Sequence, residues 1–305
     1  MAYIVAIGAY LVLLMIFGLI VAHKKVKTSD DMVTGGHRIP FIVLVGTLLA
    51  TWCGGGGITG SASVVYTGGP WVGLLTFAAP PIGIILLYFI AGKVRKSNKV
   101  TVPEIMEARY GKAASIISAL CVMLAYVGVL ATQLKAAADI IVLLCSSSGV
   151  EISHGLALTI CTVIIAVITV GGGLVSVAYS DAVSALLMVG GFFAAIPILM
   201  AAASAQGAAL PPEKLTLTGG MSGWEILGYF LPSLALMLGD QNMLQRFASA
   251  KNSDEAKKSN IGMFIGEILV IISIVLIVTQ AAKLYPTLET PSNVIFQVAV
   301  DYLPL

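Results

Sequence analysis

Long apolar stretches with few or no charged residues recur along the chain, and they constrain its fold more than any other feature. A helix needs roughly 20 apolar residues to cross a bilayer core of about 30 Å. Backbone in lipid must satisfy its own hydrogen bonds, so such stretches are predicted to be helices. We therefore expect an all-α polytopic membrane protein with about eight transmembrane helices. The stretches are 2–22, 41–67, 71–92, 114–145, 154–173, 177–203, 226–248 and 261–283.

The composition excludes several other classes of protein. Only 10% of the residues are charged, against about a quarter in soluble domains. A net charge of +2 gives little attraction for phosphate, so nucleic acid is not an expected partner. The apolar stretches hold no histidine apart from His154 at the start of the fifth, and the chain has no metal-ligand spacing or nucleophile motif. We expect a non-enzymatic protein without a cofactor, whose surroundings are the lipid bilayer.

The distribution of basic residues predicts the orientation of the chain. Fourteen of the 17 Lys and Arg residues lie in the segments after the first, third and seventh stretches. Cytoplasmic loops carry the excess of Lys and Arg, so these three segments are predicted to be cytoplasmic. The expected location is the plasma (inner) membrane, with several passes and the N-terminus outside.

Four consecutive glycines, Gly54 to Gly57, interrupt the second stretch. Each glycine favours helix by about 1 kcal/mol less than alanine, so the helix is expected to unwind there. Unwound backbone in a membrane requires a cavity, where freed carbonyls can bind sodium. The alternative is close helix packing, because Gly56 and Gly60 have the spacing of a packing motif. Trp52 and Tyr126 offer ring faces to a solute or cation, or pack against neighbours.

A second interruption lies in the seventh stretch, where polar side chains follow an apolar helix. Such side chains are costly in a membrane unless they face a cavity or a partner. The alternative is that the helix ends there and Arg246 marks the cytoplasmic surface. Two breaks five stretches apart predict inverted repeats, because an odd offset reverses the direction of crossing. The polar residues are Asp240, Gln241, Asn242 and Gln245.

Four other charged residues lie in or next to the apolar stretches. Lys135 and Asp139 are four residues apart, which predicts an ion pair on one helix face or, alternatively, a proton- or ion-coupling role. Asp181 begins the sixth stretch, either as a helix-start carboxylate or as a stop on the exit path of a cation. Glu267, two turns into the last stretch, is expected to be interfacial or paired.

Taken together, four motifs resemble those of the sodium:solute symporters, and the second and third are most similar to the choline carriers of that family. The resemblance extends over essentially the whole chain. The motifs are Gly35-Gly-His-Arg38, Ala50-Thr-Trp-Cys-Gly-Gly-Gly-Gly57, Gly171-Gly-Gly-Leu-Val-Ser-Val-Ala-Tyr-Ser-Asp181 and Leu238-Gly-Asp-Gln-Asn-Met-Leu-Gln-Arg-Phe247.

The resemblance implies a LeuT-type fold of two inverted five-helix repeats after one extra helix, with sodium and a small solute bound at the midplane. Ala50 and Cys53 match the family's backbone-carbonyl ligands for sodium. Asp181, with Ser180 beside it, matches a carboxylate implicated in sodium binding or exit. The paired hydroxyl residues that complete the family's sodium site belong to a helix beyond Leu305.

The resemblance also implies a solute site at the two breaks. The choline carriers surround a trimethylammonium group with tryptophans, of which this chain matches Trp52 alone. The other positions hold Ala125 and Asp240. The residues expected to bind the solute are Trp52, Gly54, Gly55, Tyr126, Asp240, Gln241 and Asn242.

One incomplete transmembrane domain, residues 1–305, is expected. Residues 1–38 form an extra helix and a cytoplasmic loop, residues 39–203 the first repeat, and residues 204–305 the truncated start of the second. The expected function is sodium-coupled import of a small polar organic solute by alternating access. The alternatives are a proton-coupled carrier and a transporter-like sensory membrane domain.

Overall fold

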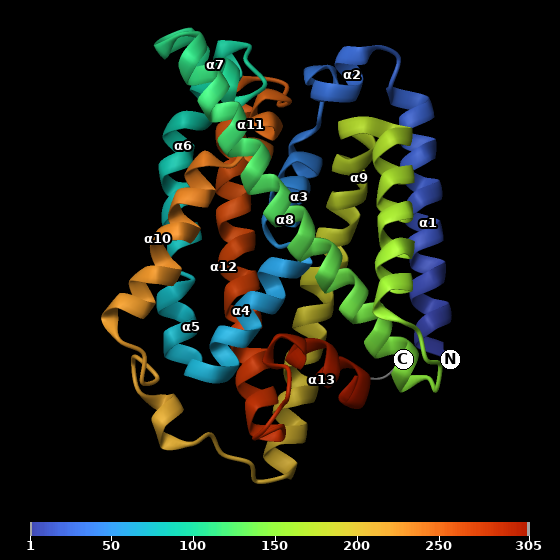
Figure 1. Cartoon of the computed structure of the whole chain (residues 1–305), viewed down its shortest axis with the longest axis vertical. Coiled ribbons are helices and arrows are strands. Elements are labelled where there is room, and N and C mark those ends of the chain that lie inside the picture. Colours follow the sequence, from blue (N-terminus) through green and yellow to red (C-terminus); the bar gives the residue numbers. More distant parts are fainter. Residues whose placement is uncertain (1, 304–305) are drawn as a thin grey trace.

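The computed structural model describes residues 2–303, which form a bundle of helices (Figure 1). Met1, Pro304 and Leu305, at the ends of the predicted domain, lie outside the described residues. The helices are α1 (Ala2–Lys25), α2 (Ser29–Thr34), α3 (Phe41–Trp52), α4 (Gly55–Gly68), α5 (Pro70–Thr76), α6 (Ala79–Ser97), α7 (Val102–Tyr110), α8 (Lys112–Ser147), α9 (His154–Ala205), α10 (Gly223–Gly239), α11 (Gln241–Ala248), α12 (Ser253–Leu284) and α13 (Val294–Tyr302).

The predicted apolar stretches are mainly helical, and the expected number of transmembrane helices is roughly consistent with the structure. Within residues 2–303, five helical stretches are long and apolar enough to cross a membrane, and the bent pair α3 and α4 adds a sixth. The predicted stretches 154–173 and 177–203 both belong to α9, which has non-helical backbone at Gly173. The second break divides the predicted stretch 226–248 between α10, which has 17 residues, and α11.

The connecting segments alternate between the two ends of the bundle. In Figure 1, α2 and α7, which belong to the Lys- and Arg-rich segments, lie at one end, and the N-terminus and α13 lie at the other. If the Lys- and Arg-rich segments are all cytoplasmic, as predicted, they have to lie at one end of the bundle, as α2 and α7 do.

Two glycines set the path of α9 past its neighbours. Gly173 has a φ of +56° inside α9, and a Cβ there would lie 2.7 Å from the carbonyl oxygen of Met32. The positive φ kinks α9 and separates its two predicted spans. Gly46 of α3 faces α9 so closely that a Cβ would lie 2.6 Å from Cα of Ala182. Helices approach this closely in membranes through small residues.

Two buried apolar clusters lie on either side of the first break. One cluster includes Leu44 and Leu48 of α3 together with Met263 of α12. The other includes Val65 of α4 together with Val270 of α12. Because both clusters draw on α12, that helix packs beside both halves of the broken helix. The polar residues between the clusters therefore lie in the middle of the bundle.

Candidate functional site

The first break joins α3 to α4 at Cys53 and Gly54, and the two helices meet at an angle of 56°. The backbone N–H of Gly56 donates to Oε1 of Gln133 on α8 at 2.8 Å. A Cβ on Gly54 would lie 2.2 Å from Nε2 of the same glutamine. Gly54 therefore lets α8 approach, and Gln133 satisfies a free donor at the start of α4.

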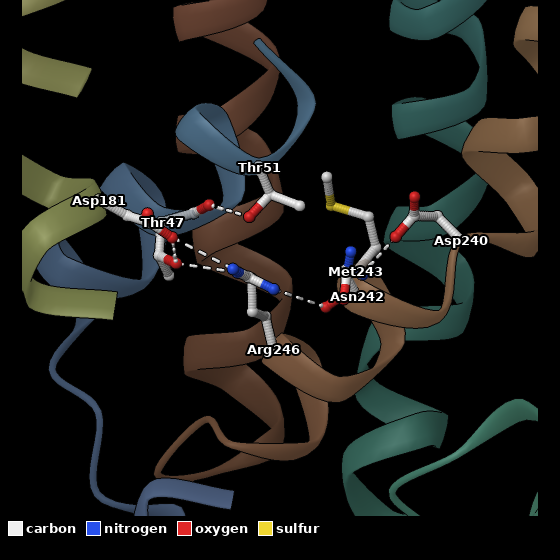
Figure 2. Close-up of polar contacts among 7 residues, drawn as sticks. All are labelled: Thr47, Thr51, Asp181, Asp240, Asn242, Met243 and Arg246. Carbon is white, nitrogen blue, oxygen red and sulfur yellow. Dashed lines mark hydrogen bonds and ion pairs between the residues drawn. The ribbon is translucent and has the colours of Figure 1, made fainter. Parts of the chain in front are cut away.

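The second break joins α10 to α11 at Asp240, which has extended backbone. Oδ1 of Asp240 accepts hydrogen bonds from the backbone N–H of Met243 at 2.8 Å and from the hydroxyl of Tyr126 at 3.1 Å. The Tyr126 hydroxyl in turn accepts from the backbone N–H of Asn242 at 3.1 Å. Figure 2 shows Asp240 beside Asn242 and Met243 at the start of α11. Tyr126 thus connects α8 to the second break.

A cavity of about 410 Å³ lies between the two breaks, within the size range of small-molecule sites. Gly57 and Gly60 of the glycine-rich segment line it, so that segment serves both the cavity and the packing against α8. Five of the residues predicted to bind solute or sodium line this cavity, namely Trp52, Cys53, Tyr126, Asp240 and Asn242.

The other predicted solute residues lie beside the cavity. Gly54 and Gly55 pack against α8 and do not line it. The side chain of Gln241 accepts from the backbone N–H of Val102 at 2.7 Å and donates to the carbonyl of Val100 at 3.2 Å. Gln241 therefore ties the second break to the segment before α7.

Glu267 of α12 differs from its sequence-based expectation. The expected interfacial position is wrong, because the residue is only 3% exposed and lines the cavity. Its Oε2 accepts a hydrogen bond from the thiol of Cys53 at 3.3 Å. Glu267 lies nine residues after Lys258, which corresponds to about 13 Å of helix. That rise places a carboxyl group near the middle of a bilayer core of about 30 Å, so the sequence contained the signal.

A network of hydrogen bonds and one ion pair links α3, α9 and α11 through Asp181 (Figure 2). Oδ2 of Asp181 accepts from the hydroxyl of Thr47 at 2.6 Å and pairs with Arg246 at 3.1 Å. Nε of Arg246 also donates to the Thr47 hydroxyl at 2.8 Å. The alternative that placed Arg246 at the surface is wrong, because the residue is 6% exposed.

The four predicted sodium residues lie in α3, at its C-terminal end and in α9. Ala50 follows Thr47 by about one turn of α3 and packs against an apolar cluster. Ser180 is buried beside Asp181, and its hydroxyl has no hydrogen-bond partner among the described residues. Cys53 lies at the end of α3 with its thiol directed to Glu267. Asp181 therefore belongs to the α3 and α9 contact, and Cys53 to the cavity.

Lys135 and Asp139 form an exposed ion pair at 2.6 Å on α8. Nε2 of His154 lies 2.9 Å from the other oxygen of Asp139. The Lys135 side chain is 68% exposed, and neither member of the pair lines the cavity. This geometry agrees with the structural reading of the pair.

Comparison with known proteins gives consistent matches. A model described as the sodium:solute symporter family matches residues 32–299. High-affinity choline transporter 1 of Drosophila melanogaster is 26% identical over 312 residues, covering 98% of this chain and 48% of that protein. High-affinity choline transporter 1 of Torpedo marmorata is 30% identical over 213 residues, covering 65% of this chain and 35% of that protein. The chain thus spans about half the length of these relatives or less.

A solved structure shares the fold. It is the substrate-bound, outward-open state of a Na⁺-coupled sialic acid symporter, with a TM-score of 0.77 and 17% identity. The match covers 99% of this chain and 66% of that chain. The likeness confirms the predicted all-α LeuT-type architecture.

Proposed function

The chain belongs to the sodium:solute symporter family, and on that premise we propose that it carries the central binding region of a sodium-coupled symporter. In this proposal a small polar organic solute enters the cavity between the two broken helices and is imported by alternating access. The observation that carries the proposal is the meeting of both breaks at one cavity of about 410 Å³. Broken helices at mid-membrane are the usual position of solute and ion sites in transporters of this kind.

The solute contacts follow from the cavity lining. Trp52 and Tyr126 offer ring faces, and Asp240 and Asn242 offer polar groups at the second break. The predicted residues Gly54, Gly55 and Gln241 support the site indirectly, since they hold α8 and the segment before α7 against the breaks. The relatives are named for choline, which is one member of the proposed class of solute.

The sodium site is proposed at the end of α3, with the carbonyls of Ala50 and Cys53 as ligands. Ser180 and Asp181 of α9 would receive sodium on its way to the cytoplasm. Asp181 is held by Arg246, so sodium passing this carboxylate has to compete with the ion pair. In this proposal, breaking the Asp181–Arg246 ion pair is therefore a step in ion release.

The membrane potential supplies part of the driving force. One sodium ion that moves down 100 mV provides about 2.3 kcal/mol, and its concentration gradient adds to that. Coupling requires that sodium bind the solute-competent state better than the other state. The proposed orientation has the N-terminus outside the plasma membrane, with residues 39–203 as the first repeat and 204–305 as the start of the second.

A proton-coupled carrier is the second candidate, and Glu267 is the observation that favours it. This buried carboxyl group has no ion-pair partner among the described residues, and such groups relay protons in some transporters. Lys135 is a poor candidate for that role, since it is exposed and outside the cavity.

The test is uptake by the protein in proteoliposomes with an imposed sodium gradient, against a panel of amines, amino acids, carboxylates and sugars. The proposal expects uptake of one compound class that stops when potassium replaces sodium at constant pH and potential. Uptake that follows a proton gradient and ignores sodium would establish the second candidate instead.

A further inference from the structure

The charged groups at the cavity are all acidic among the described residues. Asp240 and Glu267 line it, and no Lys, Arg or His does. Neither carboxyl group has an ion-pair partner within residues 2–303. The guanidinium of Arg246 binds Asp181, Thr47 and the carbonyl of Asn242, so it is already engaged.

Glu267 is the less satisfied of the two carboxyl groups. Asp240 caps α11 and accepts from Tyr126, so one of its oxygens has two strong donors. Glu267 accepts from two neutral donors, the Cys53 thiol, which is a weak donor, and the Trp52 side chain, so neither neutralises its charge. A carboxylate that is 3% exposed and lacks a cation is costly to keep charged. A bound cation in the cavity relieves that cost.

The rest of the lining matches an organic cation better than a metal ion. Four aromatic residues surround the cavity, namely Trp52, Phe77, Tyr126 and Tyr229. Ring faces attract ammonium groups. Hard metal cations such as sodium prefer a close shell of oxygen ligands. A volume of about 410 Å³ lined by rings and aliphatic side chains does not form such a shell.

On the premise of the proposed transport function, we propose that the solute is a small protonated amine, whose N–H groups donate to Glu267 on one wall of the cavity and to Asp240 on another. Glu267 is then the residue that sets specificity for positive charge. The hydrogen bonds from Met243 and Tyr126 both go to Oδ1 of Asp240, which leaves Oδ2 to accept an N–H from the solute.

The N–H groups matter because both walls present acceptors. A quaternary ammonium has no N–H, so it neutralises charge but leaves the carboxylate oxygens without donors. Hydrogen bonds to charged groups contribute about 1.5–3 kcal/mol each, so losing the last N–H is expected to weaken binding by about tenfold or more.

The first experiment measures binding to the full protein in detergent at saturating sodium, by thermal stabilisation. The ligands are 2-aminoethanol, its N,N-dimethyl and N,N,N-trimethyl analogues, and the neutral isostere 3,3-dimethylbutanol. We expect the tightest binding for 2-aminoethanol, about tenfold weaker binding for the dimethyl analogue, which keeps one N–H, a further tenfold loss for the trimethyl analogue, and no binding of the isostere. Equal binding of the isostere, or tightest binding of the trimethyl analogue, would overturn the proposal.

The matched variants are Glu267→Gln and Asp139→Asn. Both replace a carboxylate by an amide, but Asp139 lies outside the cavity in an exposed pair. Glu267→Gln is expected to weaken amine binding by about tenfold or more, and Asp139→Asn to leave it unchanged. Stabilisation by sodium alone should persist in Glu267→Gln. Its loss would make Glu267 a sodium ligand and overturn the assignment.

A second readout does not depend on binding, transport or the stability of the variant. Cys53 lines the cavity beside Glu267, so its thiol reports the local charge. In a Cys121→Ser background, we compare its rates of reaction with trimethylammonium and sulfonate methanethiosulfonates. The ratio of the two rates cancels the intrinsic reactivity of the thiol. Glu267→Gln should lower the cation-to-anion ratio about tenfold, and an unchanged ratio means that Glu267 does not carry the charge.

The two proposals fail separately. If amines bind with the expected dependence on Glu267 but sodium drives no uptake, the cation site stands and symport is wrong. If sodium drives the uptake of a neutral or anionic solute, symport stands and the amine assignment is wrong.

Discussion

Replacing Arg246 by methionine tests the network that holds Asp181. The change removes the guanidinium and leaves Asp181 without its charge partner. The pair is 3.1 Å long, with side-chain exposures of 7% for Arg246 and 25% for Asp181. Removing one partner of a buried ion pair costs about 3–5 kcal/mol. Because Asp181 keeps some access to water, we expect the lower end, about 3 kcal/mol.

The assay is thermal unfolding of the purified protein. For a chain of 305 residues, about 3 kcal/mol corresponds to a fall in Tm of about 5 °C. The control is Lys135→Met, which breaks a shorter ion pair of 2.6 Å whose lysine is 68% exposed. Exposed pairs contribute about 1 kcal/mol or less, so the control should shift Tm by about 2 °C at most.

The double variant Arg246→Met with Asp181→Asn completes the cycle. The double variant contains neither charged side chain. Its loss of stability should therefore be smaller than the sum of the losses in the two single variants by about 2 kcal/mol. Equal losses from the Arg246 and Lys135 changes would refute the argument from burial. Strict additivity in the double variant would refute the claim that the two residues act as a pair.

Three further changes test particular contacts. Gly46→Val should greatly reduce the yield of folded protein in fluorescence-detected size exclusion, because its Cβ meets the backbone of Ala182. Gln133→Leu should lower Tm and weaken solute binding, because the N–H of Gly56 loses its acceptor at an estimated cost of about 1–3 kcal/mol. Hydrogen bonds from the backbone N–H of Lys27 and from the hydroxyl of Thr28 lower the pKa of Asp31. Its contribution is therefore complete above the unfolded-state pKa of about 4 and is lost as the pH falls through the lower folded-state value, so the Tm difference between wild type and Asp31→Asn should shrink in acid.

Each of these changes has a control or a contrary result. Gly190→Val, where a Cβ meets nothing within 4 Å, should fold like the wild type. If Gln133→Leu lowers Tm without weakening binding, the glutamine supports the fold alone. A Tm difference for Asp31→Asn that is constant from pH 2.5 to 7 would mean that the carboxylate adds nothing as a charge.

The two breaks could be predicted from the sequence because their signals are local. The glycine run weakens the apolar helix and marks the position of the first break, although Gly55 to Gly57 form the first turn of α4. Asp240 with its polar neighbours marks the start of a new helix. Trp52 and Tyr126, which the sequence predicts as ring faces for a solute or as packing residues, both line the cavity.

The contacts between helices could not be predicted in the same way. The Asp181–Arg246 pair joins residues 65 positions apart, and Gln133 meets Gly56 across 77 positions. Such contacts depend on how helices pack, which periodicity does not encode. Glu267 is different, because counting the helical rise from Lys258 gives its depth from the sequence alone.

The central claim is that sodium and solute binding are coupled, and reciprocal affinity measurements test it most directly. The Kd of the solute is measured with and without saturating sodium, and the Kd of sodium with and without saturating solute. The account predicts that each ligand tightens the other by the same factor, about 5- to 150-fold. A solute Kd that is unchanged when potassium replaces sodium would contradict the account.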